Sequence, residues 1–327
     1  VMRQEDGSKA VHKVGLGTKE VLLGKTEKYR KKALDYMRAN GVKALAVKAA
    51  RKLAERTNRP VDYSDWLPKH LPTEGELSRQ RKATFDYAPK ISIVVPLYKT
   101  KEEYLKQLVD SVKAQTYTNW ELCLSDGSGK HSPISALLEK LETSDSRIKV
   151  IYNEEPLRIA QNTNAAMEAA SGDFIAFADH DDVLCEHALY ECVKVLNENP
   201  DTDVLYSDED KMSMKGNRFF MPHFKPDFNL DLLCTVNYIC HLFVAKKELI
   251  DKVGLLRPEF DGAQDYDFIF RCVEEAEHIY HIPKILYHWR CHEDSTAENP
   301  ESKMYAFDAG KRAIEAHFER IGIKAEV

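Results

Sequence analysis

Short β-branched runs alternate with amphipathic segments from residue 91 onward, and this pattern constrains the fold of the 327-residue chain more than any other feature. Strands are predicted at 91–97, 120–124, 148–152, 174–178 and 204–206, and helices at 102–115, 132–142, 159–170 and 186–197. Strands that alternate with helices of about ten to fifteen residues are joined by right-handed crossovers. We therefore predict an α/β fold, a doubly wound and mainly parallel sheet with flanking helices.

The first 60 residues differ from the rest in charge. They hold 16 Lys and Arg against 6 Asp and Glu, a net charge of +10. Because the whole chain carries a net charge of −6, the other 267 residues carry −16. Apolar residues at helical spacing in 25–38 and 43–56, with Asn40-Gly41 between them, predict a basic helical hairpin. Such a hairpin either docks on the main domain as a solvated pair or is attracted to anionic lipid headgroups or a lipid-phosphate substrate. Nucleic acid is disfavoured, because interleaved aromatic residues are lacking and the remaining chain is acidic.

Residues 61–90 contain several prolines and predict an irregular linker with one short helix, which places a domain boundary near residue 90. Polar segments follow the predicted strands at 96–99, 125–128, 179–182 and 207–210. In doubly wound sheets, ligands bind at the carboxyl ends of the strands, so these segments are the candidate site. No G-x-G-x-x-G follows the first strand and the chain has no G-x-x-x-x-G-K-[ST], which excludes a Rossmann dinucleotide turn and a P-loop.

Three carboxylates, Asp179, Asp181 and Asp182, close the fourth predicted strand. Crowded like charges raise each other's pKa and destabilise the fold unless a cation neutralises them. Aspartate oxygens suit Mg²⁺ or Mn²⁺, which commonly fill their remaining positions with water and substrate phosphates. A helix cap is the alternative, but one aspartate is enough for a cap. The cluster therefore predicts a site for Mn²⁺ or Mg²⁺ with a diphosphate.

Five motifs follow one another along the chain: Ser92-Ile-Val-Val-Pro96-Leu-Tyr98, Asp126-Gly-Ser128, Phe177-Ala-Asp179-His-Asp181-Asp182, Gln264-Asp265-Tyr-Asp267 and Tyr287-His-Trp-Arg290-Cys-His292. Their order and spacing resemble a family 2 glycosyltransferase of the GT-A fold, the type found in bacterial surface-polysaccharide assembly. The resemblance implies a GT-A domain over 91–327, with a nucleotide-sugar half at 91–210 and an acceptor half with a C-terminal helix at 211–327. It is preceded by the basic hairpin at 1–60 and the linker at 61–90.

The resemblance also implies where a sugar nucleotide binds. Pro96 and Tyr98 are expected to shape the base and ribose pocket, although Tyr98 can equally be ordinary packing. Asp126 is expected to accept a hydrogen bond from a pyrimidine base, with an Asx turn as the alternative. Arg158 is expected beside the nucleotide or, equally, as a solvated surface residue.

By the same resemblance, Asp179 and Asp181 form the Asp-x-Asp element, with Asp181 the expected metal ligand and Asp182 a second one. The ion would bridge two phosphates and stabilise the departing nucleoside diphosphate. Asp265 is the expected general base for an in-line displacement that inverts the anomeric carbon, and Gln264 stands where many relatives carry Glu. The alternative for Asp265 is a carboxylate that stabilises the helix dipole.

The remaining expectations concern residues near the sugar and the phosphates. His292 is expected to complete the metal shell, and Arg290 or Ser295 to contact phosphate oxygens. Asp208 is expected in the sugar and acceptor region. A lone histidine is more commonly a packing or surface residue, which is the alternative for His292.

The sequence thus predicts an inverting, metal-dependent glycosyltransferase that moves a sugar from a UDP or dTDP sugar to a hydroxyl of a glycan or lipid-linked glycan. An aspartate-dependent phosphatase with Asp179 as nucleophile is one alternative, but its motif normally closes a first strand, and here three strand–helix units precede it. A non-catalytic sugar-nucleotide or glycan-binding subunit is the other, although the acids expected at the metal and base positions are all retained.

The sequence predicts a cytoplasmic protein, peripheral at the inner face of the cell membrane if the basic hairpin binds lipid. Seven scattered cysteines include no C-x-x-C pair, which favours a reducing compartment. Apolar runs fall well short of the ~20 residues of a membrane span, and no secretory leader opens the chain. The first residue is Val1 rather than Met, as expected for a piece of a longer protein.

Overall fold

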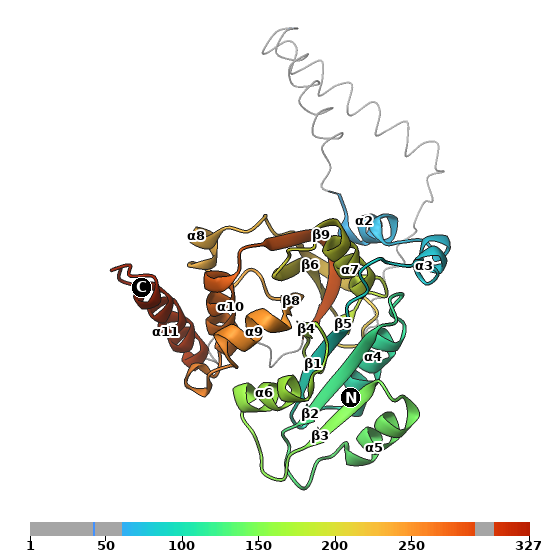
Figure 1. Cartoon of the computed structure of the whole chain (residues 1–327). Helices are drawn as coiled ribbons and strands as arrows, with labels where there is room; N and C mark the ends of the chain where they lie inside the picture. The colour runs from blue at the N-terminus through green and yellow to red at the C-terminus, as the bar shows by residue number, and fades with distance from the viewer. Residues whose placement is uncertain (1–41, 43–60, 292–303) are drawn as a thin grey trace, which may run out of the picture. The chain divides into compact units, whose positions relative to one another are not determined.

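The computed structural model describes residue 42 and residues 61–291 and 304–327. Its centre is a nine-stranded sheet in the order β3-β2-β1-β4-β8-β6-β9-β5, with β7 paired to β6 (Figure 1). The strands are β1 (Ile91–Leu97), β2 (Trp120–Asp126), β3 (Ile148–Tyr152), β4 (Phe174–Phe177), β5 (Val183–Leu184), β6 (Val204–Met212), β7 (Phe219–His223), β8 (Phe243–Lys246) and β9 (Ile279–Arg290).

Four strands, β3, β2, β1 and β4, run parallel, as the strand–helix alternation predicts. The antiparallel strand β8 then lies between β4 and β6, with Phe177 opposite Phe243 and Tyr206 also opposite Phe243. β6 pairs in parallel with the long strand β9. The predicted α/β fold with a mainly parallel sheet is confirmed, and β8 brings a segment from the second half of the chain to the end of β4.

Helices cover both faces of this sheet. They are α2 (Tyr63–His70), α3 (Glu74–Gln80), α4 (Glu102–Lys113), α5 (Ser135–Ser144), α6 (Ile159–Ala169), α7 (Ala188–Glu198), α8 (Leu230–Leu233), α9 (Lys247–Val253), α10 (Gln264–Glu275) and α11 (Met304–Arg320), with a 3₁₀ turn η1 at Pro258–Phe260. Figure 1 shows α9 and α10 beside β8, and α11 on the other side of α10.

Strand β1 shows why the parallel strands are apolar at every position. Its residues are all buried, because helices pack on both faces of the sheet. Ile93 and Val95 point into one core with α4, α5 and α7, while Val94 points into a second core with α6 and α10. A strand that is apolar on both faces therefore fixes the centre of the sheet and leaves the chemistry to its carboxyl end.

Residues 63–90 differ from the predicted linker, because they contain two helices and pack on the domain. Helix α3 begins with a capping box in which Thr73 and Glu76 satisfy each other's backbone amides. Leu67 of α2 is 5% exposed and packs with Cys185 and Ile285. These residues belong to the compact unit that runs from 63 to 327.

In the described part of the chain, no helix is both long enough and apolar enough to cross a bilayer. The predicted basic hairpin at 1–60 lies outside the described residues, apart from the exposed, helical Val42. His292 and Ser295 also lie outside them.

Candidate active site

The acidic segment at 179–182 follows the end of β4, as the sequence predicts, and leads into β5, a short strand that the sequence did not predict. Asp182 is fully buried, and both of its carboxylate oxygens accept hydrogen bonds. The Tyr287 hydroxyl donates to Oδ2 at 2.6 Å, and the backbone amide of Arg290 donates to Oδ1 at 2.7 Å. The Tyr287 hydroxyl also accepts from the backbone amide of Asp179 at 3.0 Å. Strand β9 therefore sets the shape of the acidic segment.

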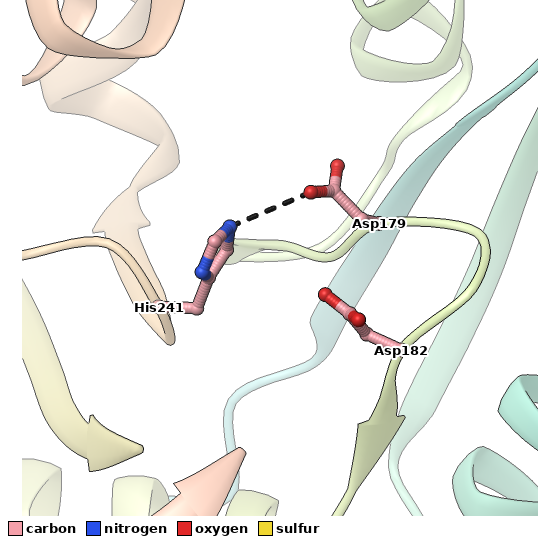
Figure 2. Close-up of side chains that lie close together, drawn as sticks. All are labelled: Asp179, Asp182 and His241. Atoms are coloured by element: carbon pink, nitrogen blue, oxygen red, sulfur yellow. Dashed lines mark ion pairs between the residues drawn. The ribbon is translucent and has the colours of Figure 1, made fainter. Parts of the chain in front are cut away.

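His241 completes a three-residue cluster with Asp179 and Asp182 (Figure 2). It stands just before β8, which pairs with β4, so it faces the residues that follow β4. Its Nε2 lies 3.5 Å from Asp179 Oδ2, and its ring stacks on Tyr287 with centroids 4.8 Å apart. One ligand atom of each of the three side chains lies within 4.8 Å of the others.

Two carboxylates and one imidazole form a donor set that fits Mn²⁺ or a similar divalent ion. Burial, with the neighbouring charges of Asp181 and Asp179, raises the pKa of Asp182 well above its ordinary value. Burial opposes protonation of His241, but Cys240, Asp179 and Glu209 outweigh it and raise the pKa of His241 well above its ordinary value. A protonated His241 therefore balances the acids, and a bound cation would take over that role once the imidazole gives up its proton.

Glu209 supports His241 from the side opposite Asp179. Its Oε2 lies 3.3 Å from His241 Nδ1, and its side chain is 7% exposed. Burial would raise the pKa of Glu209, but hydrogen bonds from His223 and His241 and the charge of Lys225 lower it instead. Glu209 therefore stays ionised and favours an Nδ1–H on His241, which leaves Nε2 directed at Asp179.

Asp265 is the second residue of α10, in the first turn of the helix. The Asn237 side chain donates to its Oδ2 at 3.0 Å. Burial raises the pKa of Asp265, the charge of His241 opposes this, and Asp179 adds to it. Asp265 therefore lies close enough to the three-residue cluster to respond to its charges. Among the described residues, Asn237 Oδ1 is buried without a hydrogen-bond partner, so an acceptor of hydrogen bonds is available beside Asp265.

Gln264 turns back toward the loop before α10. Its Oε1 accepts from the backbone amide of Gly262 at 2.9 Å, and Gly262 has φ +102°, a conformation that glycine adopts readily. The Gln264 side chain thus satisfies an amide at the entry of the helix. This contact fixes the loop that leads into α10, the helix that carries Asp265.

The family model for glycosyl transferase family 2 matches residues 92–254. The domain that contains residues 92–254 belongs to glycosyl transferase family 2. The chain is 43% identical over 234 residues to the uncharacterized protein y4gI of Sinorhizobium fredii, which covers 71% of this chain and 26% of that protein. It is 34% identical over 295 residues to the O-antigen biosynthesis protein RfbC of Myxococcus xanthus, which covers 89% of this chain and 23% of that protein.

The chain therefore spans about a quarter of the length of these two curated relatives. Among solved structures, S. aureus TarS 1-349 in complex with UDP-GlcNAc matches with a TM-score of 0.57 at 20% identity, over 72% of this chain and 68% of that one. This likeness shows the fold, which is of the GT-A type.

In this family 2 domain, the residues expected to hold the nucleotide gather at the ends of β1 and β2 and the start of α6. Pro96 is buried within β1, and the Tyr98 side chain after it is 48% exposed. Asp126 ends β2, and its Oδ1 accepts from the backbone amide of Ser128 at 3.0 Å, which is the Asx turn. Arg158 is exposed at the N-cap position of α6. Their contacts with a nucleotide stay predictions.

Two residues of the family 2 domain do not lie where their predicted contacts require. Arg290, expected at the phosphates, is fully buried. Its guanidinium donates to the carbonyl of Asp181 at 2.5 Å, to Met214 at 2.7 Å and to Gln107 at 2.6 Å. Because β9 runs through the interior in register with β6, the Arg290 side chain is buried against the backbone of the acidic segment and positions it.

Asp208 is the second correction. It was expected in the sugar and acceptor region, but it is 3% exposed. Its Oδ1 accepts from the backbone amide of Lys225 and lies 2.8 Å from His281 Nε2. The Lys225 ammonium in turn reaches toward Glu209, with the two charged atoms 3.8 Å apart. Asp208 thus belongs to the buried support of the site.

Sequence reasoning missed His241 and the supporting role of Tyr287. Glu209 lies in the polar segment 207–210 that the sequence singled out, but it was expected with Asp208 and Asp210 near the sugar and acceptor, and the structure places it within the longer strand β6 beside His241. His241 lies in an irregular stretch before β8, far along the chain from the acids. Only the pairing of β8 with β4 brings it to them, and that pairing joins a strand that the alternation did not predict.

Proposed function

We propose that the chain is an inverting, metal-dependent glycosyltransferase. It moves a sugar from a UDP or dTDP sugar to a hydroxyl of a glycan or lipid-linked glycan acceptor in cell-surface polysaccharide synthesis. One observation carries the proposal. The Asp179–Asp182–His241 cluster and the carboxylate of Asp265 converge on the same edge of a family 2 domain, close enough for their charges to interact.

The donor side rests on the loops after β1 and β2. Tyr98 is exposed where a base or ribose can stack on it, and Lys99 ties this loop to the next through a hydrogen bond from its amide to Ser128 Oγ at 2.9 Å. Asp126 holds the Asx turn with Oδ1, and a carboxylate has a second oxygen for a pyrimidine N–H, so both roles are compatible. The TarS complex with UDP-GlcNAc supports a UDP sugar as donor.

Asp179, Asp182 and His241 would hold the divalent ion, and Asp181 lies beside them. When bound, that ion supplies Lewis-acid stabilisation for the negative charge of the departing diphosphate. Tyr287 and Arg290 hold the acidic segment in place from below, so no reorganisation is needed when charge develops. Asp181 as a direct ligand stays a prediction.

Asp265 acts as the general base. Its carboxylate takes the proton from the acceptor hydroxyl as that oxygen attacks the anomeric carbon from the face opposite the diphosphate, which inverts the configuration. The raised pKa of Asp265 makes it a better proton acceptor than an exposed aspartate. Asn237 fixes the carboxylate through one hydrogen bond and presents its carbonyl oxygen to the acceptor.

The acceptor class and the location rest on one relative and on the charge of the first 60 residues. RfbC is named for O-antigen biosynthesis, which supports a surface-polysaccharide acceptor. The excess of ten basic charges in residues 1–60 would attract anionic lipid and keep the domain at the inner face of the membrane in the cytoplasm.

The decisive experiment measures nucleotide release and donor binding with a panel of sugar nucleotides, with Mn²⁺ or with EDTA. A donor present at 100 times its Kd stabilises the fold by about 2.7 kcal/mol, which a thermal shift detects. Asp265→Asn should keep this shift and lose transfer at least 100-fold, because it removes a general base. The exposed helical Asp308→Asn is the matched control and should transfer at the wild-type rate.

Three outcomes would contradict the proposal in different ways. Transfer by Asp265→Asn at the wild-type rate removes the base assignment. Mn²⁺-dependent donor binding without transfer to a broad acceptor panel would support the non-catalytic alternative. Release of phosphate from a phosphomonoester without any sugar nucleotide would support the phosphatase alternative.

A further inference from the structure

A cavity of about 600 Å³ lies between α2, α3, α4 and the β5 end of the sheet, and its lining includes Val183, the residue that follows the acidic segment. Much of its lining is apolar and includes Leu71, Leu77, Ala114, Leu184 and Phe219. Cys185 and His288 also line it, whereas Asp179, Asp182, His241 and Asp265 do not. Its volume falls in the range of pockets that hold small-molecule ligands, about 300–1,000 Å³.

A chain of hydrogen-bonded side chains runs from this cavity into the core. Cys185 Sγ lies 3.1 Å from His288 Nε2, and His288 Nδ1 lies 2.6 Å from Asp210 Oδ1. The Tyr63 hydroxyl donates to the other oxygen of Asp210 at 2.5 Å. Cys185 and His288 are each 6% exposed, and Asp210 is fully buried. Cys185, His288 and Asp210 thus stand in the order of a thiol, a base and a carboxylate that orients the base.

This arrangement places a base beside the thiol. With Nδ1–H directed at Asp210, His288 Nε2 can take the thiol proton, although the thiol can alternatively donate to the Ile285 carbonyl at 3.3 Å. Burial opposes a charged His288, but Cys185 and Asp210 outweigh it and raise the pKa of His288 to about 10. The Phe219 ring packs on the imidazole with centroids 4.2 Å apart.

Three other cysteines of the described chain lie in different surroundings. Burial raises the pKa of both Cys123 and Cys192 to about 12, as expected for thiols in apolar surroundings. Cys234 is more exposed than Cys185, and burial with the charge of Asp231 raises its pKa as well. Reactivity governed by the imidazole would therefore select Cys185, whereas reactivity governed by exposure would select Cys234.

We propose that Cys185 is a nucleophilic thiol that accepts a medium- or long-chain acyl group from an acyl thioester bound in this cavity. The apolar lining holds the acyl chain, and the carrier stays at the polar part of the lining, which includes Asp110 and Glu186 as well as the exposed Lys215. The Cys185 thiolate attacks the thioester carbonyl carbon, and a new S–C bond forms. The bond from that carbon to the carrier sulfur breaks, and the carrier thiolate leaves with the proton from His288 Nε2.

The test incubates the full chain with octanoyl-coenzyme A and follows intact mass and peptide mass. One octanoyl group should appear on Cys185, and hydroxylamine should remove it. Cys185→Ser should abolish the adduct, His288→Gln should slow it at least tenfold, and Cys234→Ser should leave its rate unchanged. The readout needs no sugar nucleotide, so its failure is distinct from failure of the proposed transferase activity.

A cavity-filling variant keeps the proposal testable if His288→Gln does not fold. Ala114→Phe places a ring in the cavity without touching the Cys185–His288 pair, and should slow octanoyl transfer at least tenfold in a protein that unfolds at the wild-type temperature. Acylation of Cys234 at a rate equal to that of Cys185, no adduct on native protein, or an unchanged rate in folded Ala114→Phe would each overturn the proposal.

Discussion

The hydroxyl of Tyr287 lies 2.6 Å from a carboxylate oxygen of Asp182, a residue 105 positions earlier in the chain. The same hydroxyl accepts from the Asp179 amide, and the Tyr287 ring stacks on His241. One side chain of β9 therefore touches all three members of the candidate metal cluster. Strand β9, which belongs to the second half of the chain, fixes the acids that belong to the first.

Replacing Tyr287 by Phe should weaken this arrangement. The buried Asp182 would lose one of its two hydrogen-bond donors, which costs about 1–3 kcal/mol in the free energy of unfolding. The stabilisation that Mn²⁺ confers in a thermal shift should fall as well, because Asp179 and Asp182 lose their common anchor. Tyr206→Phe is the matched control, since its hydroxyl donates to the Pro226 carbonyl instead. A full Mn²⁺ response in Tyr287→Phe would contradict the anchoring role.

The sequence alone predicted the parallel half of the sheet well, because strands such as β1, buried on both faces, are recognisable from their composition. It also placed Asp179 and Asp182 at a strand end and Asp265 at a helix start. It could not find His241, since its position depends on an antiparallel pairing between strands remote in the chain. Local pattern shows which residues end a strand, but long-range register decides which of them meet.

The same limit explains the two corrections. Arg290 and Asp208 are charged residues within strands, whereas the family resemblance placed Arg290 in a loop over the phosphates and Asp208 in the sugar and acceptor region after a strand. The register of β6 with β9 places both inside the protein, where the charges are satisfied by Gln107, Lys225 and His281. Strand register, which one sequence does not reveal, decides whether a charged strand residue faces a ligand or supports the site from within the protein.

Arg290→Lys tests that distinction. A lysine ammonium cannot reproduce the planar fork that reaches Asp181, Met214 and Gln107, so the unliganded protein should lose about 2 kcal/mol or more of unfolding free energy. The measurement is chemical denaturation in EDTA without nucleotide. If Arg290 served the phosphates instead, the unliganded stability would not change and only donor affinity would fall. Lys211→Arg on the neighbouring strand β6 is the control, because it exchanges the same two residue types and keeps the charge.

Asp267→Asn should separate stability from catalysis within one helix. Asp267 is fully buried and forms ion pairs with Arg257 and with Arg271, the latter at 3.1 Å. Breaking a buried pair by removing one charge costs about 3–5 kcal/mol. Below its lowered unfolding temperature, the variant should still transfer, whereas Asp265→Asn should stay folded and lose transfer. The measurement compares denaturation curves and transfer rates of the two variants side by side. Equal stability of the two variants would contradict the assignment of Asp267 to stability and Asp265 to catalysis.

Glu121→Gln should show a stability loss that depends on pH. Burial alone would raise the pKa of Glu121, but hydrogen bonds from Lys90, Ser92 and Lys149 outweigh it and lower the pKa to about 2. A carboxylate with a lowered folded-state pKa stabilises the fold above its unfolded pKa, and this is lost as pH falls toward 2. The variant should be about 2–3 kcal/mol less stable at pH 7, and the difference should shrink below about pH 4.5. Glu102→Gln, from an exposed pair, should show little change.

The pKa of Asp265 shifts in the direction opposite to that of Glu121, so the carboxylate proposed as the general base also lowers the stability of the fold when it is ionised. Burial raises this pKa, so the folded state binds the proton more tightly than the unfolded state does. Stability contributed by the protonated form is therefore present below the unfolded pKa of about 3.9 and declines as pH rises through the raised folded pKa. Asn cannot ionise, so Asp265→Asn in EDTA should lack this decline and should be more stable than the wild type at pH 7.

The same titration should appear in the transfer rate with the opposite sign. A general base must be ionised, so kcat/KM of the wild type should rise with pH through the raised pKa of Asp265, over the range in which its contribution to stability falls. The residual transfer by Asp265→Asn should lack this rise of kcat/KM with pH, while Asp308→Asn should retain it. Coincidence of the two pH ranges, one from denaturation and one from kinetics, would identify a single group behind both. A limb that persists in Asp265→Asn would assign the acidic transition to another carboxylate and remove Asp265 as the base.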